Sequence, residues 1–144
     1  MIKQAVTKDS ITLAKLAIQM WDSHTETELE REFSKIINSK TAVCFIKYFE
    51  NIPIGFAQCG LRNDYVEGAK SSPVGYLEGM FIAEQYRNKG YAKELLIACE
   101  KWAKEKGCNE FASDCELNNV NSLKFHLAMG FDEANRIICF KKDI

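Results

Sequence analysis

Basic residues and a glycine gather where a predicted strand passes into a predicted helix. The run from residue 81 to residue 107 begins with apolar residues and ends in a helical pattern, and Arg87, Lys89 and Gly90 lie at the join. The first N–H groups of a helix lack partners within the helix and lie at the positive end of its dipole. Gly90 lets a ligand approach the backbone, and the two basic side chains add positive charge. The join therefore predicts an anion site, for which a pyrophosphate is the natural ligand.

This join does not have the spacing of the common nucleotide motifs. Its sequence, RNKGYA, contains neither G-x-x-x-x-G-K-[ST] nor G-x-G-x-x-G. Nucleotide hydrolysis and dinucleotide binding are therefore disfavoured. Taken alone, the same residues also fit a solvated basic turn.

Glu78 is a second residue that could do chemistry. It lies between Leu77 and Gly79 in VGYLEGMFIA (residues 74–83), which has the pattern of a central strand. A carboxylate without a role is costly to bury in such a strand, so we expect Glu78 to be functional. The acid-rich run 22–32 fits a solvated helix face, and only its start is expected to lie near a substrate. Further acidic residues fall on predicted loops or strand ends: Asp64, Glu67, Asp114 and Glu116.

The elements that must position these residues follow from the hydrophobic periodicity. Apolar spacing predicts a helix over 12–21, capped by Asp9 or Ser10, and an amphipathic helix over 22–39. Runs rich in β-forming residues predict a hairpin over 41–50 and 52–62, and a polar loop over 63–73 precedes the strand 74–83. The remaining predicted elements are a first strand over 1–6, a helix from Lys89 or Gly90 to Gly107, a strand over 108–116, a helix over 118–130 and a hairpin over 131–143. The order predicts one α+β domain, residues 1–144, with a mixed central sheet flanked by helices.

Composition argues against several classes of partner. The formal net charge of −1 gives no support for binding to nucleic acid or to an anionic membrane. The first residues lack the pattern of a secretory signal, and no apolar run approaches the roughly 20 residues of a membrane span. A cytoplasmic protein is expected.

The six cysteines are numerous for this length but form no C-x-x-C pair. Most lie in apolar runs, so we expect them to be reduced, buried side chains. With only His24 and His126 available and no ligand spacing, no metal site is expected.

Two motifs together resemble the GCN5-related N-acetyltransferases, the GNAT family. The hexapeptide RNKGYA (87–92) fits the R/Q-x-x-G-x-G/A coenzyme A loop of that family, and NVNSLKFHLAMGF (119–131) matches its N-x-x-[AS]-x-x-x-Y-x-x-x-G-F helix. The resemblance covers the whole chain and implies an acyl-CoA N-acyltransferase fold with acetyl-CoA as cofactor. It implies that acetyl-CoA contacts Met80, Phe81, Ile82, Arg87, Asn88, Lys89, Gly90, Tyr91, Ala92, Lys93, Asn119 and Ser122.

A more specific resemblance is to aminoglycoside 6′-N-acetyltransferases of chromosomal type. It rests on MWDSH (20–24), RNDYVEGAKSSPVGYLEGMF (62–81), ASD (112–114) and HLAMGF (126–131), with Asp22 standing where those enzymes usually carry Pro. It implies a polycationic substrate, antibiotic resistance and a homodimer built on the C-terminal strands. Carboxylates suit a polycation, in keeping with the acidic residues on the predicted loops. The implied substrate-binding residues are Trp21, His24, Tyr65, Glu78 and Asp114.

The chemical steps of amide formation indicate which residues should be catalytic. The attacking amine is largely protonated near pH 7, and Glu78 is the expected base, acting directly or through a water, as well as a cation anchor. The thioester oxygen gains negative charge and needs a donor, which this family places at the backbone N–H near Met80; Gly79 would allow a local bulge there. His126 stands where the family usually has Tyr, and it is either the acid for the leaving thiolate or a residue that holds the cofactor. Nothing pairs Cys115 with a base, so direct transfer is favoured over an acyl-enzyme.

Two alternatives remain open. The chain could acetylate a polyamine, another small amine or a peptide N-terminus, or it could be a non-catalytic sensor of acyl-CoA. Glu78 and Asp114 argue against the sensor, and the acidic loops argue against a peptide substrate. Turnover of acetyl-CoA with kanamycin, tobramycin, spermidine and a peptide separates these possibilities.

Overall fold

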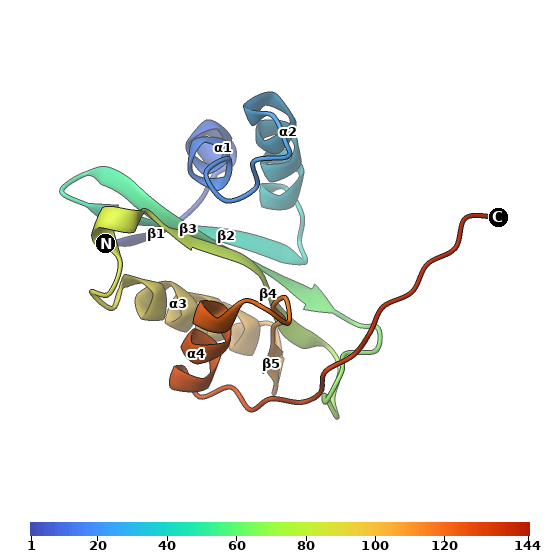
Figure 1. The fold of residues 1–144 in the computed structure, drawn as a ribbon. Coiled ribbons are helices and arrows are strands. Elements are labelled where there is room, and N and C mark those ends of the chain that lie inside the picture. Colours follow the sequence, from blue (N-terminus) through green and yellow to red (C-terminus); the bar gives the residue numbers. More distant parts are fainter.

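The computed structural model describes residues 1–144 and has helices on both faces of one sheet (Figure 1). In chain order the elements are β1 (Ile2–Gln4), η1 (Thr7–Asp9), α1 (Ser10–Ala17), α2 (Glu26–Ile37), β2 (Ala42–Phe49), β3 (Ile52–Arg62), β4 (Val74–Ile82), η2 (Glu84–Tyr86), α3 (Tyr91–Glu105), β5 (Phe111–Ala112) and α4 (Val120–Ala128). The helices α1 and α2 cover one face of the sheet, and α3 and α4 cover the other (Figure 1). The α+β class predicted from the sequence is confirmed.

The sheet is mixed, and its two halves differ in how far the strands stay paired. The strand order is β1-β2-β3-β4-β5, with antiparallel pairing from β1 to β4. The parallel pair β4–β5 is limited to Gly75 opposite Phe111 and Tyr76 opposite Ala112. From Leu77 to Ile82, β4 therefore has a strand partner on its β3 side only. The second half of β4 presents a free backbone edge.

A β-bulge interrupts the pairing of β3 with β4. Cys59 lies opposite Leu77 and Gln58 lies opposite Gly79, which makes Glu78 the extra residue. Bulges of this kind increase the local twist and redirect side chains. The local bulge that Gly79 was expected to allow is present, and its extra residue is Glu78, which was singled out for chemistry.

Two apolar clusters hold the helices to the sheet. Between the sheet and the pair α1–α2, the fully buried side chains include Leu13, Leu29, Phe33, Ile46 and Phe56. On the opposite face, α3 buries Leu95, Leu96, Cys99, Trp102 and Ala103. Part-buried side chains of α4 and the residues after it pack on this second cluster: Phe125, Met129 and Phe131. The helical stripes read from the sequence thus face the sheet from both sides.

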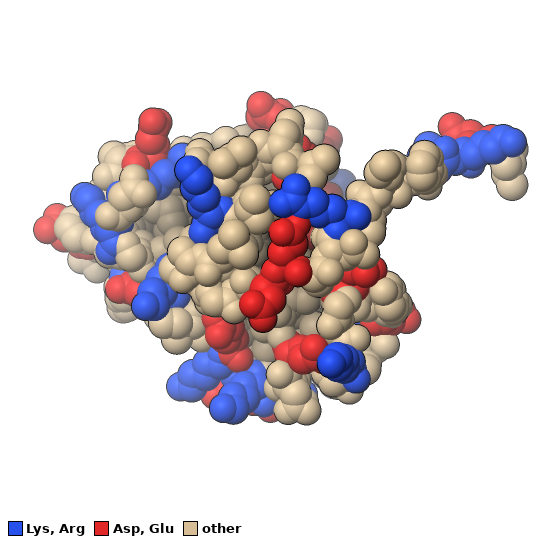
Figure 2. Space-filling model, turned by 60° about the horizontal axis from the view of Figure 1, so that its bottom comes forward, with Lys and Arg blue, Asp and Glu red and all other residues tan.

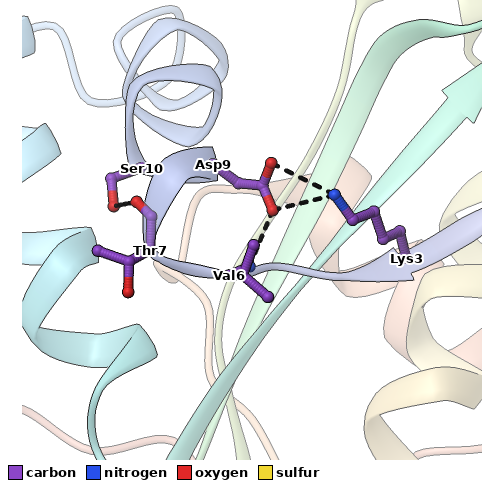
Figure 3. Close-up of polar contacts among 5 residues, drawn as sticks. All are labelled: Lys3, Val6, Thr7, Asp9 and Ser10. Atoms are coloured by element: carbon purple, nitrogen blue, oxygen red, sulfur yellow. Dashed lines mark hydrogen bonds and ion pairs between the residues drawn. The ribbon is translucent and has the colours of Figure 1, made fainter.

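A buried carboxylate fixes the turn between β1 and α1 (Figure 3). Asp9 is 7% exposed, and one carboxylate oxygen accepts from the N–H of Val6 at 2.8 Å. The ammonium of Lys3 lies 3.3 Å from the same oxygen. Ser10 donates its hydroxyl to the carbonyl of Thr7 at 2.6 Å. Asp9 was expected to cap α1, but its side chain instead closes the preceding turn.

The first two helices are shorter than the periodicity suggested. The predicted spans 12–21 and 22–39 appear as α1 (10–17) and α2 (26–37). A capping box sets the start of α2, because the hydroxyl of Thr25 accepts from the N–H of Glu28 at 3.2 Å and the Glu28 carboxylate accepts from the N–H of Thr25 at 3.4 Å. The intervening residues 18–25, which include Trp21 and His24, are left to form a connection between the helices.

The C-terminal predictions are the least accurate. The predicted strand 108–116 is wrong in length, since only Phe111 and Ala112 pair with β4. The predicted hairpin over 131–143 is wrong, because no helix or strand follows α4, and the chain leaves the body as an extended arm (Figure 1). Two strands without a third element to pack on are only marginally stable, and the apolar residues of the arm are exposed. Its residues Ile137, Ile138 and Phe140 are 66%, 80% and 89% exposed.

Four of the six cysteines are buried as expected: Cys44, Cys59, Cys99 and Cys108. Burial raises the pKa of the Cys44 thiol to about 12, which keeps it neutral and unreactive. Cys115 and Cys139 are exposed, contrary to the expectation of burial, because they lie on the segment that leaves β5 and on the arm. None of the helices has both the length and the apolar character needed to cross a membrane.

We predict that Asp9→Ala lowers the free energy of unfolding by about 1–3 kcal/mol, because it leaves the N–H of Val6 without its charged acceptor. Urea titration followed by circular dichroism gives this difference. The matched control is Asp22→Ala, which removes an exposed carboxylate of the same type. Equal stability of the two variants would contradict the role given to Asp9.

Candidate active site

The junction between β4 and α3 has the geometry of an anion site. Gly90 precedes α3 with φ of 84°, and Asn88 also lies in the left-handed region with φ of 61°. The amides of residues 88–93 donate to no acceptor in the protein. A Cβ placed on Gly90 would meet no atom within 4 Å, so the space in front of these amides is open. The first turn of α3 therefore offers a row of free donors at the positive end of the helix dipole.

Basic side chains surround this junction, and one of them is fixed to the sheet. The Nε of Arg87 donates to the carbonyl of Ile82 at 2.7 Å, and its guanidinium lies 5.7 Å from the ring centre of Phe81. The ammonium of Lys89 lies 5.7 Å from the ring centre of Tyr86. Lys93 is exposed, whereas Tyr91 and Ala92 are half-buried at the start of α3. The positive charge predicted for this site is present and faces solvent.

An ion pair between a buried lysine and a half-exposed glutamate supports the junction from the sheet side. Lys47 on β2 is 6% exposed, and its ammonium forms an ion pair with the carboxylate of Glu94 in the first turn of α3. The same ammonium lies 4.7 Å from the ring centre of Tyr91. Burial by itself lowers the pKa of Lys47, but the interactions with Glu94, the N-terminal amine and Tyr91 together raise it above its ordinary value. This pair ties the start of α3 to the sheet.

Glu78 lies at the surface and not in the core. Its side chain is 32% exposed, so the expectation that it would be a buried carboxylate is wrong. The bulge explains the difference, because the extra residue turns its side chain out of the sheet. Trp21 lies against the next residue of β4: a Cβ on Gly79 would come within 2.7 Å of the Trp21 ring. Trp21 also packs on Phe33 and Phe56, so this half-buried residue belongs to the core edge and to the wall of the site.

Both oxygens of Glu78 are held by an arginine. Arg62, the last residue of β3, donates from Nε to Oε1 at 3.1 Å and from Nη2 to Oε2 at 3.0 Å. Its guanidinium carbon lies 3.4 Å from the ring centre of Tyr76. Tyr76 in turn donates its hydroxyl to Asp114. A continuous polar chain thus joins Glu78 on β4 to Asp114 beyond β5.

The hydrogen bonds between Glu78 and Asp114 shift the pKa values of the two groups that connect them, Arg62 and Tyr76. Hydrogen bonding to Glu78 raises the pKa of Arg62. Burial, and then the hydrogen bond to Asp114, raise the pKa of Tyr76. Both groups therefore keep their protons throughout the ordinary pH range, Arg62 as a cation and Tyr76 as a neutral donor.

His126 forms a separate set of hydrogen bonds next to Asp114, through Ser113, which precedes Asp114 in the sequence. Its Nε2 lies 2.8 Å from the hydroxyl of Ser113, and its Nδ1 lies 2.7 Å from the carbonyl of Ser122. Since a carbonyl only accepts, Nδ1 carries the proton, and Nε2 of the neutral ring accepts from Ser113. Asn119 accepts from the N–H of Ser122 at 3.1 Å and caps α4. The second motif thus builds the start of α4 and orients His126.

Two predicted substrate residues stand apart from this chain. Tyr65 is 80% exposed on the loop between β3 and β4, and its hydroxyl donates to Glu67 at 2.8 Å. His24 is exposed in the connection before α2, with Nδ1 3.6 Å from a carboxylate oxygen of Glu28. Neither is bonded to Glu78, Asp114 or His126.

A cavity of about 1010 Å³ adjoins the Asp114 end of the chain. It lies among β5, α4, the loop around Val66 and the first part of the arm. Tyr76, Asp114 and His126 line it together with apolar residues of the arm. The site therefore consists of two regions, an open basic junction at α3 and an acidic region that runs from Glu78 to this cavity.

Arg62, Tyr76 and Ser113 lie in sequence blocks that carry the resemblance, but no role was predicted for them. Tyr76 and Glu78 are two apart on one strand, and this spacing could have indicated that their side chains share a face. The bulge at Glu78 interrupts the alternation of side chains only beyond this pair. Arg62 ends the preceding strand, and only the observed register places it beside Glu78. No group of three or more His, Cys, Asp and Glu side chains is arranged to hold a metal ion.

The sequence matches the acetyltransferase (GNAT) family over residues 13–131. The aminoglycoside N(6′)-acetyltransferase type 1 of Salmonella typhimurium is 39% identical over 124 residues, which are 86% of each chain. The corresponding enzyme of Acinetobacter genomosp. 13 is 35% identical over 144 residues, covering 99% of this chain and 96% of its own.

Solved structures agree with these matches. AAC(6′)-Iy in complex with the bisubstrate analogue CoA-S-monomethyl-acetylneamine is similar with a TM-score of 0.96 and 35% identity, over 100% of this chain and 98% of that one. AAC(6′)-Ih of Acinetobacter baumannii is similar with a TM-score of 0.92 and 35% identity, over 100% and 98% of the two chains. The chain therefore belongs to the GNAT acetyltransferase family and, within it, to the aminoglycoside N(6′)-acetyltransferases.

Proposed function

We propose that this protein transfers an acetyl group from acetyl-CoA to the 6′-amine of aminoglycosides and thereby confers resistance to them. The observation that carries the proposal is the position of Glu78. It lies on the free half of β4, in the same strand as residues that lead to the α3 anion site, and it is linked to a second carboxylate, Asp114. A cation can therefore meet an anionic cofactor at this strand. The full-length similarity to aminoglycoside N(6′)-acetyltransferases supports the same substrate class.

The cofactor side is the junction of β4 with α3. We propose that the amides of residues 88–93, with Arg87, Lys89 and Lys93, receive the pyrophosphate of acetyl-CoA. The open backbone edge at Met80, Phe81 and Ile82 would pair with the extended arm of the cofactor, as a strand adds to a sheet edge. We propose that Asn88, Tyr91, Ala92, Asn119 and Ser122 complete the contacts to the cofactor. Bound acetyl-CoA supplies an activated acyl group, and no metal takes part in the proposal.

The acceptor side is the acidic region around Glu78 and Asp114. A polycation is attracted by these carboxylates over a distance set by the Debye length, about 10 Å at 0.1 M salt. We propose that Trp21 forms one wall and that Tyr65 and His24, both exposed on neighbouring loops, close over the bound sugar rings. This division of charge would place the pyrophosphate at the α3 junction and the polycation in the acidic region, so that the thioester and the 6′-amine meet beside Glu78 and Met80.

Three residues of this chain carry the proposed chemistry. Glu78 removes a proton from the acceptor ammonium, directly or through a water, and the N–H near Met80 stabilises the oxygen that gains negative charge. For His126 we favour a holding role over that of an acid. Both of its ring nitrogens are engaged, with Ser122 and Ser113, so donation to a leaving group would first require loss of the Ser113 bond.

We further propose that residues 1–144 form a single catalytic domain and that two copies form a homodimer through their arms, residues 132–144. The outer part of the arm stands clear of the body in two views (Figures 1 and 2). Its apolar residues are exposed, and the short strand β5 leaves the outer edge of the sheet open. Exposed apolar segments of this kind mark interaction sites. The arm of each copy would cover the cavity or the sheet edge of the other.

A cytoplasmic location completes the proposal. All six cysteines are free thiols, including the exposed Cys115 and Cys139, as is usual in a reducing compartment.

We expect acetyl-CoA to stabilise the fold by about 2.7 kcal/mol at a hundredfold excess over its dissociation constant, and Gly90→Glu to abolish this effect. The variant places bulk and negative charge in front of the free amides. Thermal unfolding with and without acetyl-CoA measures the shift. Gly107→Glu is the matched control, because Gly107 also has a positive φ, of 92°, and open surroundings at the other end of α3. Full protection of Gly90→Glu would place the anion site elsewhere.

Glu78→Gln tests the catalytic proposal, because it keeps size and removes basicity. We expect kcat with kanamycin at pH 7 to fall by about 10²–10⁴. The deficit should shrink towards pH 9, where the amine loses its proton to solvent. Release of coenzyme A thiol from pH 6 to pH 9 gives kcat and KM. A rise in KM alone would reduce Glu78 to a cation anchor, and wild-type values of both would remove it from the reaction.

Sedimentation tests the assembly. The wild type should sediment at twice the chain mass of 16.4 kDa, and the double variant Ile138→Asp with Phe140→Asp should sediment as a monomer, because charge replaces two exposed apolar side chains of the arm. Ile97→Asp, which changes an exposed apolar residue of α3, should remain a dimer. A monomeric wild type, or a dimeric double variant, would contradict the proposed interface.

A further inference from the structure

We propose that Arg62 is a positioning residue, which fixes the carboxylate plane of Glu78 and couples it to Asp114 through Tyr76. The proposal rests on the proposed function, since it concerns how Glu78 is held for that reaction. Arg62 itself would touch neither the acetyl group nor the acceptor amine.

The contact with Glu78 determines an orientation as well as a distance. Each carboxylate oxygen accepts one N–H of the same guanidinium, at 3.1 and 3.0 Å. Two parallel bonds between planar groups hold both groups in one plane, which a single bond does not do. A carboxylate has about four acceptor sites, so this pair leaves acceptor positions free on both oxygens of Glu78.

The guanidinium is itself held from a second direction. It lies flat enough over Tyr76 for its central carbon to be 3.4 Å from the ring centre. The ring cannot turn away freely, because its hydroxyl is bonded to Asp114 and Tyr76 is 7% exposed. Arg62 is thus fixed by a buried aromatic face, although its own side chain is 41% exposed.

Glu78 needs such a partner because its backbone does little to hold it. It is the extra residue of the bulge, it precedes a glycine, and its side chain is partly exposed. A flexible carboxylate would spend little time in the geometry for proton transfer, and a misplacement of about 1 Å can cost about 100-fold in rate. The bidentate contact with Arg62 compensates for the freedom that the bulge creates.

The contact between Arg62 and Glu78 is also compatible with the opposite role, in which Arg62 inhibits the reaction. Experiment distinguishes the two roles. Arg62 is a cation on the carboxylate expected to attract the acceptor ammonium, so it could compete with the substrate. A competitor would weaken activity, and its removal would raise kcat/KM. A positioning residue has the reverse effect, because its removal lowers kcat.

Arg62→Met and Arg62→Lys distinguish these roles. Met keeps an unbranched stem over Tyr76 but has no donors, and Lys keeps the charge without the planar fork. We expect kcat with kanamycin to fall about 10- to 100-fold in Arg62→Met, with a smaller fall in Arg62→Lys. Protection by acetyl-CoA against thermal unfolding should stay at the wild-type level in both. The matched control is Arg31→Met on the exposed side of α2, which should leave kcat unchanged.

A double-mutant cycle tests whether Arg62 acts through Glu78. If it does, Arg62→Met should cause no further loss of kcat in the Glu78→Gln background, because there is no longer a base to position. Independent losses that multiply would overturn the proposal. A rise of kcat/KM in Arg62→Met would identify a competing cation and would also overturn it. Wild-type kcat in Arg62→Lys would show that charge alone suffices.

These outcomes are distinct from failure of the proposed function. If the wild type did not acetylate kanamycin, the proposed substrate would be wrong. If the wild type is active and the Arg62 variants match it, the enzyme assignment stands and the positioning role fails.

Discussion

The divergence of β4 from β5 is the constraint on which the site depends. The two strands are paired for only two residue positions and then separate, so that β4 runs from Leu77 to Ile82 with a free backbone edge. An unpaired edge inside a sheet is normally a liability, because its N–H and C=O groups lack partners. Here it leads directly into the free amides at the start of α3. One strand therefore carries an open edge, a bulged carboxylate and an anion site in succession.

The supporting interactions all stabilise this open arrangement. Lys47 and Glu94 tie the first turn of α3 to β2, and Arg87 ties the junction to the end of β4. On the other side, Tyr76 joins the last paired position of β4 to Asp114, across the point where the strands separate. These contacts hold the two sides of the opening without filling it. Charge then divides along the strand, with the cations at α3 and the carboxylates near Glu78.

Local patterns in the sequence predicted the parts of the site that local structure creates. The helix dipole and Gly90 are properties of one junction, and their geometry follows from RNKGYA. The bulge beside Gly79 was also foreseen. By contrast, the pairing of Arg62 with Glu78 depends on the register of β3 against β4, which periodicity does not give. The burial expected for Glu78 was wrong for the same reason, because only the register shows that Glu78 is the extra residue of the bulge.

The C-terminal residues show a different limit. The apolar run from Ile137 to Phe140 is rich in β-forming residues, yet residues 131–144 form no strand, because a strand also needs a partner edge. Pattern alone does not tell whether that partner lies within the same chain or in another copy. The burial of the six cysteines was also predicted only in part. The four that lie in β2, β3 and α3 or just after α3 are buried, and the two that follow β5 are exposed.

The most direct test of the account is the position of the acetyl group on the product. Neomycin and paromomycin differ only at the 6′ position, which carries an amine in neomycin and a hydroxyl in paromomycin. With acetyl-CoA and the wild-type protein, the account predicts a singly acetylated neomycin, with the acetyl group on the 6′ nitrogen by NMR, and no product from paromomycin. Equal turnover of both compounds, or acetylation of neomycin at another amine, would contradict it.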